Sequence, residues 1–231
     1  MRWLIALLLS ALAQTAAADE TLRVCYNYGC LHEAEVRYTD RQFAQVEAFL
    51  AAAGDAADER DRLSLVIGWL LAWAGEQTAI AADRGGNVAD DGIDGRMDCI
   101  DHSTTTTRLL RMLENRRWLR FHQVLEPVQR TRYLFAVHFS AQIGETAAAT
   151  TPDGEAGTSR HYVVDSWFRD NGRPAVVMPL PEWLAGGGEE ESSLAAMASL
   201  AAGAPASRRI PILPMLASPV NDRLLRHRLR F

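Results

Sequence analysis

Cys99 is the residue of this chain whose type and setting are best suited to chemistry. It lies in the run Met97-Asp98-Cys99-Ile100-Asp101-His102, at a point where a helix is expected to begin. A thiol is a nucleophile only as the thiolate, and the unpaired N–H groups and positive dipole end of a helix N-terminus stabilise that charged form. The pattern therefore indicates a catalytic thiol, against the plainer alternative of a buried and inert cysteine.

A catalytic thiol needs a base beside it and an acceptor that orients the base, and these usually come from distant parts of the chain. His138 and Asp165 each lie in an apolar run that is expected to be a strand. If the two strands form a hairpin that turns near residues 151–154, His138 and Asp165 lie directly opposite one another on one face of the sheet. A register slip of one residue would move one of them to the other face.

His102 is the competing base, because it follows Cys99 by three residues and would share a helix face with it. The same two residues, with Asp98 and Asp101, could instead bind a metal ion. Two such ligands do not complete a zinc site, however, and the chain has no second cluster of cysteine and histidine. We favour His138 over His102 as the base, and we expect neither a metal nor another cofactor.

The segment 83–97, which leads into Cys99, is rich in glycine and aspartate. Asp90, Asp94 and Asp101 repeat part of the spacing of an EF-hand calcium loop. Glycine stands at the third position of that loop, however, and the shorter aspartate replaces the bidentate glutamate at the twelfth. We therefore interpret the segment as a flexible loop beside the active site.

The oxyanion that forms when a thiolate attacks an amide needs hydrogen-bond donors in fixed positions. The backbone N–H of Cys99, at the start of its helix, is the natural first donor. An upstream side chain usually supplies the second, and Gln77, Asn87 and Trp73 are open candidates. The spacing does not choose among them, so none is assigned to the site.

The elements expected around these residues are helices first and strands afterwards. Apolar residues at intervals of three and four predict a helix that Asp40 caps and Gly54 ends, and a longer one over 58–82. A further helix continues from Asp101, where four consecutive threonines require support from tertiary packing. Strands are expected at 118–126, 131–143, 160–168 and 175–178. This order predicts an α+β domain whose nucleophile-bearing helix packs on an antiparallel sheet.

Residues 1–18 have the features of a secretory signal peptide, with a basic start, a short apolar stretch and the small residues Ala16-Ala17-Ala18. The apolar stretch is far shorter than the roughly 20 residues of a membrane span. Export to the periplasm or beyond is therefore expected, in a compartment where disulfides persist. Of the three possible pairings, proximity favours Cys25 with Cys30, which leaves Cys99 as a free thiol.

Charge and composition restrict the partners. The chain has 24 basic and 29 acidic residues, a formal net charge of −5, which argues against nucleic acid. Every basic residue is arginine, so Schiff-base chemistry and a lysine base are excluded. We expect one domain over 19–185, followed over 186–231 by a linker and a tail with prolines and arginines. The tail could contact an anionic membrane, although a solvated terminal helix is the interpretation we favour.

These residues resemble the transglutaminase-like superfamily, and most closely the bacterial transglutaminase-like cysteine proteinases. The resemblance covers residues 40–185 and rests on an apolar helix and two strands that carry Asp98-Cys99-Ile100-Asp101-His102, His138 and Val163-Val164-Asp165-Ser166-Trp167. It implies a papain-like fold in which Cys99 is the nucleophile, His138 is the general base and acid, and Asp165 orients the imidazole.

The resemblance also implies a function, an exported thiol-dependent hydrolase that acts on amide bonds of a protein or peptide in the cell envelope. Hydrolysis and transamidation pass through the same thioester, so the sequence does not separate them. Met97 stands where the family often has glycine, and Ile100 where it has an acidic residue that helps some relatives to bind calcium. These departures keep open a catalytically inactive transglutaminase-like binding or assembly module.

Overall fold

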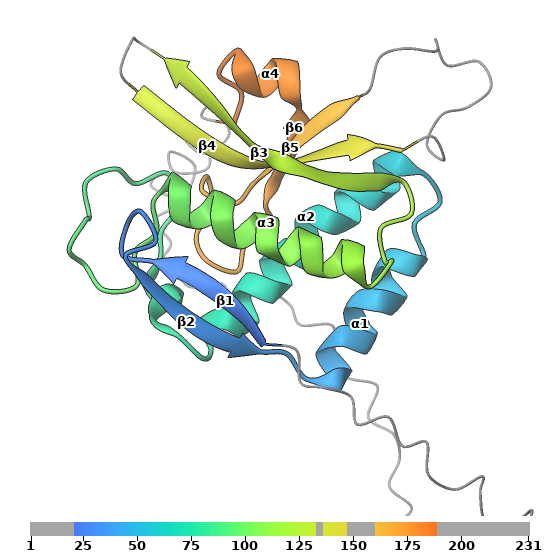
Figure 1. Ribbon diagram of the computed structural model, residues 1–231, viewed down its shortest axis with the longest axis horizontal. Coiled ribbons are helices and arrows are strands. Elements are labelled where there is room, and N and C mark those ends of the chain that lie inside the picture. Colours follow the sequence, from blue (N-terminus) through green and yellow to red (C-terminus); the bar gives the residue numbers. More distant parts are fainter. Residues whose placement is uncertain (1–20, 133–135, 147–159, 189–231) are drawn as a thin grey trace, which may run out of the picture.

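The computed structural model describes residues 21–132, 136–146 and 160–188 (Figure 1). The helices are α1 (Asp40–Ala51), α2 (Ala56–Gly75), α3 (Cys99–Asn115) and α4 (Leu180–Leu184), with a 3₁₀ turn η1 (Ala79–Ala82). The strands are β1 (Thr21–Tyr26), β2 (His32–Arg37), β3 (His122–Arg132), β4 (Ala136–Glu145), β5 (His161–Asp165) and β6 (Val176–Pro179). The fold is therefore α+β, as predicted.

Two antiparallel sheets enclose the central helix α3. One sheet has the strand order β3-β4-β5-β6, and the other is the hairpin β1-β2. In Figure 1, α3 runs between the four-stranded sheet above it and the hairpin below it, with α2 behind. The short helix α4 lies on the opposite side of the four-stranded sheet from α3. The helix that begins with Cys99 is thus held from both sides.

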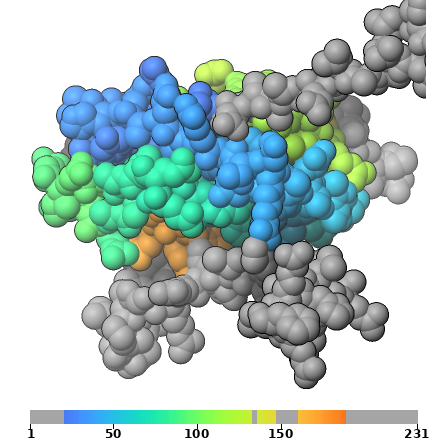
Figure 2. Space-filling model, turned by 90° about the horizontal axis from the view of Figure 1, so that it is seen from below, coloured from blue at the N-terminus to red at the C-terminus, as the bar shows by residue number. Residues whose placement is uncertain are grey.

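The main hydrophobic core lies around α3. Leu109, Leu110 and Leu113 are fully buried, together with apolar residues of α2, the hairpin and the inner sheet face. Seen from below, β1, β2, α1 and α2 form a continuous surface that covers this core (Figure 2). A smaller cluster that includes Phe168 and Trp183 packs on the other sheet face. Burial on both faces restricts the strands to one register, because a slip would expose apolar residues.

The first two helices differ slightly from their predicted limits. Thr39, not Asp40, is the N-cap of α1, and its hydroxyl accepts the backbone N–H of Gln42 in a capping box. The predicted helix over 58–82 ends at Gly75 and is followed by the separate turn η1. The last residue of α2 is closely packed, since a Cβ at Gly75 would lie 2.5 Å from the side-chain nitrogen of Asn171 and 3.2 Å from the Cα of Ala81.

The first two predicted strands, 118–126 and 131–143, were divided at the wrong place. A single strand, β3, runs through Pro127, and β4 begins at Ala136. The register of β3 on β4 shifts between Leu125 and Val128, so Pro127 lies in an irregularity of the ladder. Because β3 is at the edge of the sheet and the irregularity is local, the missing N–H of proline is tolerated there.

The hairpin β1-β2 was not predicted. Its sequence signal is the alternation of buried Leu22 and Val24 with exposed Thr21 and Arg23, a period of two that is typical of a half-buried strand. The short apolar content of β2, where Val36 is the buried residue, makes that signal weak.

Two predictions fall on parts of the chain that the structure does not cover. The signal peptide of residues 1–18 lies outside the described residues, as does the linker and tail from residue 189 onward. Within the described ranges, no helix is both long and apolar enough to cross a membrane.

Candidate active site

Cys99 is the first residue of α3, and Asp98 caps the helix. Asp98 Oδ1 accepts the backbone N–H of Ile100 at 3.0 Å and that of Asp101 at 2.9 Å. The cap uses these two N–H groups and not that of Cys99, which is the group expected to donate to an oxyanion. The Cys99 thiol is free and partly exposed, and its Sγ lies 3.9 Å from the carbonyl oxygen of Val137 on β4.

His138, on β4, forms a hydrogen bond between Nε2 and Asp165 Oδ2 at 2.7 Å. Asp165 is the last residue of β5 and is 1% exposed. Its Oδ2 also accepts the indole N–H of Trp183 at 2.9 Å, and its Oδ1 accepts the backbone N–H of Trp167 at 3.2 Å. These bonds hold the carboxylate in one orientation toward the imidazole and leave Nδ1 as the ring nitrogen for the thiol.

The electrostatics of His138 favour its charged form. Burial alone would lower the pKa of His138, but hydrogen bonds and charge attraction from Asp165 and Cys99 outweigh it and raise the pKa to about 9. The rings of Trp167, Phe168 and Trp183 lie around the imidazole, with centroids 4.8, 5.3 and 5.6 Å away. A pKa of about 9 favours the imidazolium form of His138 at neutral pH.

His138 and Asp165 share a face of the sheet as predicted, but in a different register. The strands pair with Ala141 opposite Val164, a register that places Asp165 opposite Ser140 and two residues away from His138. Because side chains alternate with a period of two, this shift keeps both residues on one face as diagonal neighbours, within reach of each other. The predicted turn at 151–154 lies outside the described residues.

His102 is not available as a base for Cys99, because both of its ring nitrogens have other partners. Its Nδ1 lies 2.8 Å from Ser166 Oγ, and its Nε2 lies 3.0 Å from Asp83 Oδ2. The side chain is buried, so both ring nitrogens are used in the interior. The alternative of a metal site built from Asp98, Cys99, Asp101 and His102 is not supported by this arrangement.

The aspartates of the calcium-like spacing point to separate partners. Asp90 accepts the Tyr28 hydroxyl at 2.5 Å and pairs with Arg96, and Asp94 accepts the side-chain N–H of Asn27. Burial and the hydrogen bond to Asp90 raise the pKa of Tyr28, so its phenol stays protonated. Because these carboxylates do not converge with Asp101, they do not form an EF-hand site.

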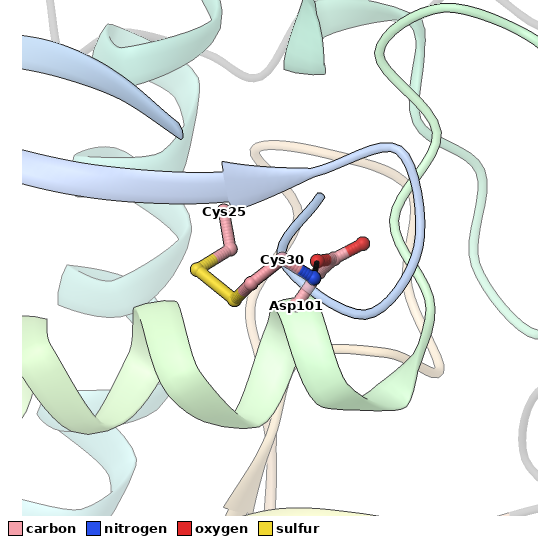
Figure 3. Close-up of side chains that lie close together, drawn as sticks. All are labelled: Cys25, Cys30 and Asp101. Carbon is pink, nitrogen blue, oxygen red and sulfur yellow. Dashed lines mark hydrogen bonds between the residues drawn. A yellow bond between two sulfur atoms is a disulfide. The ribbon is translucent and has the colours of Figure 1, made fainter. Parts of the chain in front are cut away.

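The predicted disulfide between Cys25 and Cys30 is confirmed. Figure 3 shows the two cysteines beside Asp101 of α3. One sulfur atom of each cysteine and a carboxylate oxygen of Asp101 lie within 4.8 Å of one another, a grouping that could suggest a metal site. Both sulfurs are joined in the disulfide, so neither can act as a thiolate ligand.

The turn closed by the disulfide binds the start of α3. All four residues of the turn, 27–30, have positive φ, between 55° and 66°. Their backbone N–H groups therefore point to one side, and those of Tyr28 and Cys30 donate to Asp101 at 2.8 and 2.6 Å, while that of Gly29 donates to Asp98. Burial raises the pKa of Asp101 to about 6, with the nearby charge of Asp98 adding to it and the N–H of Cys30 opposing it.

Of the three candidates for a second oxyanion donor, only Asn87 lines the cleft, whereas Gln77 and Trp73 have other contacts. Gln77 binds backbone groups of Arg37 and Trp73 and thereby fixes β2 to the end of α2. Trp73 packs on the ring of Tyr38 as part of the core. Asn87 lines the cleft beside Cys99.

The cleft has a volume of about 380 Å³, and Cys99 and His138 both line it. Three polar residues of its lining were not predicted from the sequence: Tyr28, Arg130 and Arg132. Arg130 lies directly opposite His138 in the β3–β4 register, so its position followed from a strand pairing that the sequence did not reveal. Other parts of the wall are the apolar side chains of Val88, Val137 and Trp167.

Compared with models of protein families, with curated proteins and with solved structures, the chain shows no match. What the site can do is therefore argued from its own geometry.

Proposed function

We propose that the chain is an exported thiol-dependent hydrolase that acts on amide bonds through Cys99, His138 and Asp165. The observation that carries the proposal is the 2.7 Å hydrogen bond between His138 and Asp165 in a cleft that also holds a free thiol at a helix N-terminus. Nucleophile, base and orienting acid in this order are the parts of a cysteine hydrolase.

The reaction follows from the positions of these groups. Cys99 Sγ attacks the carbonyl carbon of the amide, and the N–H of Cys99 donates to the oxygen that becomes negative. The His138 imidazolium, whose Nε2–H is held by Asp165, gives its Nδ1 proton to the leaving amine as the C–N bond breaks. A thioester on Cys99 remains. Water, or an amine in the case of transamidation, then attacks the thioester while His138 accepts its proton, and the thiolate is released.

A papain-like or transglutaminase-like core agrees with the arrangement of the elements. The nucleophile begins a helix that packs on an antiparallel sheet, and the base and acid come from neighbouring strands of that sheet. The disulfide supports an oxidising compartment such as the periplasm or the cell exterior. Val88 is 80% exposed and Val137 is 45% exposed at the cleft, and such apolar edges suit a protein or peptide substrate in the cell envelope.

A binding or assembly module that keeps the fold without the reaction is the competing proposal. The same exposed apolar side chains favour it, because they would also suit a partner that is bound and not cleaved. The two proposals differ in the state of the thiol, which can be measured without knowing the substrate.

The experiment is alkylation of Cys99 by iodoacetamide under non-reducing conditions, followed by intact mass between pH 5 and 9. With Cys25 and Cys30 joined, Cys99 is the one free thiol among the three cysteines. We expect alkylation to persist below about pH 7, and His138→Ala to move the midpoint toward the value of about 8.5 typical of a free thiol.

Two variants control this measurement. His161→Ala removes a histidine of β5 whose ring contacts Gln142, and it should leave the pH profile unchanged. Cys99→Ala should abolish labelling and any amide hydrolysis. A wild-type profile like that of a free thiol would reject the hydrolase and favour the binding module.

A further inference from the structure

A second chain of polar groups lies behind the site, joining Asp83, His102, Ser166 and Thr106. His102 Nε2 lies 3.0 Å from Asp83 Oδ2, His102 Nδ1 lies 2.8 Å from Ser166 Oγ, and that oxygen lies 2.9 Å from Thr106 Oγ1. All four residues are buried. The proposed mechanism does not use any of them.

One arrangement of protons satisfies the whole chain. In this arrangement the Nε2–H of His102 would donate to Asp83, Nδ1 would accept the hydroxyl hydrogen of Ser166, and Ser166 Oγ would accept the hydroxyl hydrogen of Thr106. The order serine, histidine, aspartate is that of a hydrolytic triad. Ser166 is only 3% exposed and His102 only 2%, however, so no substrate can reach the serine oxygen. This chain of bonds is therefore not a second catalytic centre.

Its two middle members, His102 and Ser166, lie next in the chain to residues of the proposed site. His102 is one helical turn after Cys99, and Ser166 directly follows Asp165. Asp83 also accepts the backbone N–H of Met97 at 2.9 Å, two residues before Cys99. The buried bonds therefore connect the segment and first turn that carry the thiol to the strand end that carries the acid.

We infer that His102 is a positioning residue that sets the distance between Cys99 and the His138–Asp165 pair. This inference rests on the proposed function of these three residues. Cys99 reaches the cleft from a helix, whereas His138 and Asp165 lie on paired strands. Apolar packing between helix and sheet is not directional, so the bonds of His102 and Ser166 add a fixed distance between the two elements. A buried hydrogen bond has few alternative partners, so this connection has one geometry. A loss of about 1 Å in such positioning can reduce a rate by about a hundredfold.

The chain offers a matched control for a purely structural role. His122 is also a buried histidine bonded to a buried carboxylate, with Nδ1 2.8 Å from Glu59 Oε1. It lies at the start of β3 and pairs with Glu145, the far end of β4 from His138. His122→Gln should therefore destabilise the fold without changing the thiol.

The test compares His102→Gln, Ser166→Ala and His122→Gln in the full chain. Melting temperature is measured by circular dichroism, and the iodoacetamide profile of Cys99 by mass. We expect His102→Gln and Ser166→Ala to slow alkylation at pH 6 by about tenfold, which corresponds to a shift of about one pH unit in the profile. His122→Gln should lower the melting temperature and keep the wild-type profile.

Each outcome decides the inference. If wild type shows the low-pH reactivity and His102→Gln and Ser166→Ala keep it, the positioning role is wrong while the proposed function stands. If wild type already behaves as a free thiol, both are overturned. Should His102→Gln fail to fold, Ser166→Ala decides, because it removes only one hydroxyl and leaves the bond between His102 and Asp83 in place.

Discussion

At the scale of single residues, His138 is the group on which the proposed chemistry depends most. Asp165 and Cys99 act on it from two sides and raise its pKa to about 9 against the effect of burial. Trp183 helps to fix the orientation of the Asp165 carboxylate, because its indole N–H donates to Oδ2, the oxygen that also bonds to His138. A charged imidazole with these partners therefore contributes to stability as well as to the proposed reaction.

The pH dependence of the free energy of unfolding tests whether the charged form of His138 stabilises the fold. Because the folded pKa is above the unfolded value of 6.5, the contribution of His138 is fully present below pH 6.5 and is lost as the pH rises through about 9. We expect wild type to exceed His138→Gln in free energy of unfolding most at pH 6. The difference should fall with a slope of at most about 1.4 kcal/mol per pH unit.

Urea unfolding at intervals between pH 6 and 10 measures this difference. The same comparison in a Cys99→Ala background is the control. Cys99 is one of the two groups that raise the pKa, so the slope should be smaller there. A difference between wild type and His138→Gln that does not change with pH would contradict the charged imidazole.

At the scale of elements, two short connecting segments hold the start of α3. The disulfide turn donates backbone N–H groups to Asp98 and Asp101, and the loop after η1 is hydrogen-bonded to this turn. In that loop, the N–H of Gly95 donates to Asn27 Oδ1 at 2.8 Å, so the two segments are bonded to each other. Backbone conformation at Gly95 is therefore part of how the site is built.

Gly95→Ala and Gly92→Ala separate two costs of adding a side chain. Both glycines have φ near +82°, so each alanine pays about 1–2 kcal/mol for a left-handed backbone. A Cβ at Gly95 would also lie 2.0 Å from the carbonyl oxygen of Ala79, whereas nothing lies within 4 Å of a Cβ at Gly92. We expect Gly95→Ala to lower the free energy of unfolding clearly more than Gly92→Ala, as measured in urea. Equal losses would show that the loop moves freely away from η1.

At the scale of the whole molecule, a buried carboxylate joins the helices to the sheet at the end away from the cleft. Glu59 of α2 accepts the backbone N–H of Arg120 at 2.7 Å and of Phe121 at 3.1 Å, and it bonds to the ring of His122. No part of the Glu59 side chain is exposed. Because the connection from α3 to β3 ends at these residues, their bonds fix where the sheet begins.

Glu59→Gln tests that connection. It keeps the shape of the side chain but loses the charge that several N–H groups share, so we expect a loss of about 3 kcal/mol in the free energy of unfolding. Glu126→Gln is the control, since this side chain is 90% exposed in its pair with Arg111 and should change stability by less than about 1 kcal/mol. A loss from Glu59→Gln as small as that of the control would contradict its role in joining the two layers. The reactivity of Cys99 should be the same in both.

The sequence was most informative where the signal is local. Three predictions depend on residues close together in the chain: the start of α3 at Cys99, the disulfide between cysteines five residues apart, and the order of helices and strands. The hairpin β1-β2, the continuation of β3 through Pro127 and the exact register of β4 on β5 depend on pairing between distant segments. A period of two constrains the face of a strand but not its partner, which is why His138 and Asp165 were placed on the right face in the wrong register.

Part of the cleft wall comes from a different kind of backbone than the three residues of the proposed site. His138 and Asp165 belong to paired strands and Cys99 to a helix, while Tyr28, Asn87 and Val88 belong to connecting segments outside the regular elements. Connecting segments tolerate replacement far better than packed strands do. Exchange of Asn87 and the exposed Val88 would therefore reshape this side of the cleft, while Cys99, His138 and Asp165 keep their places.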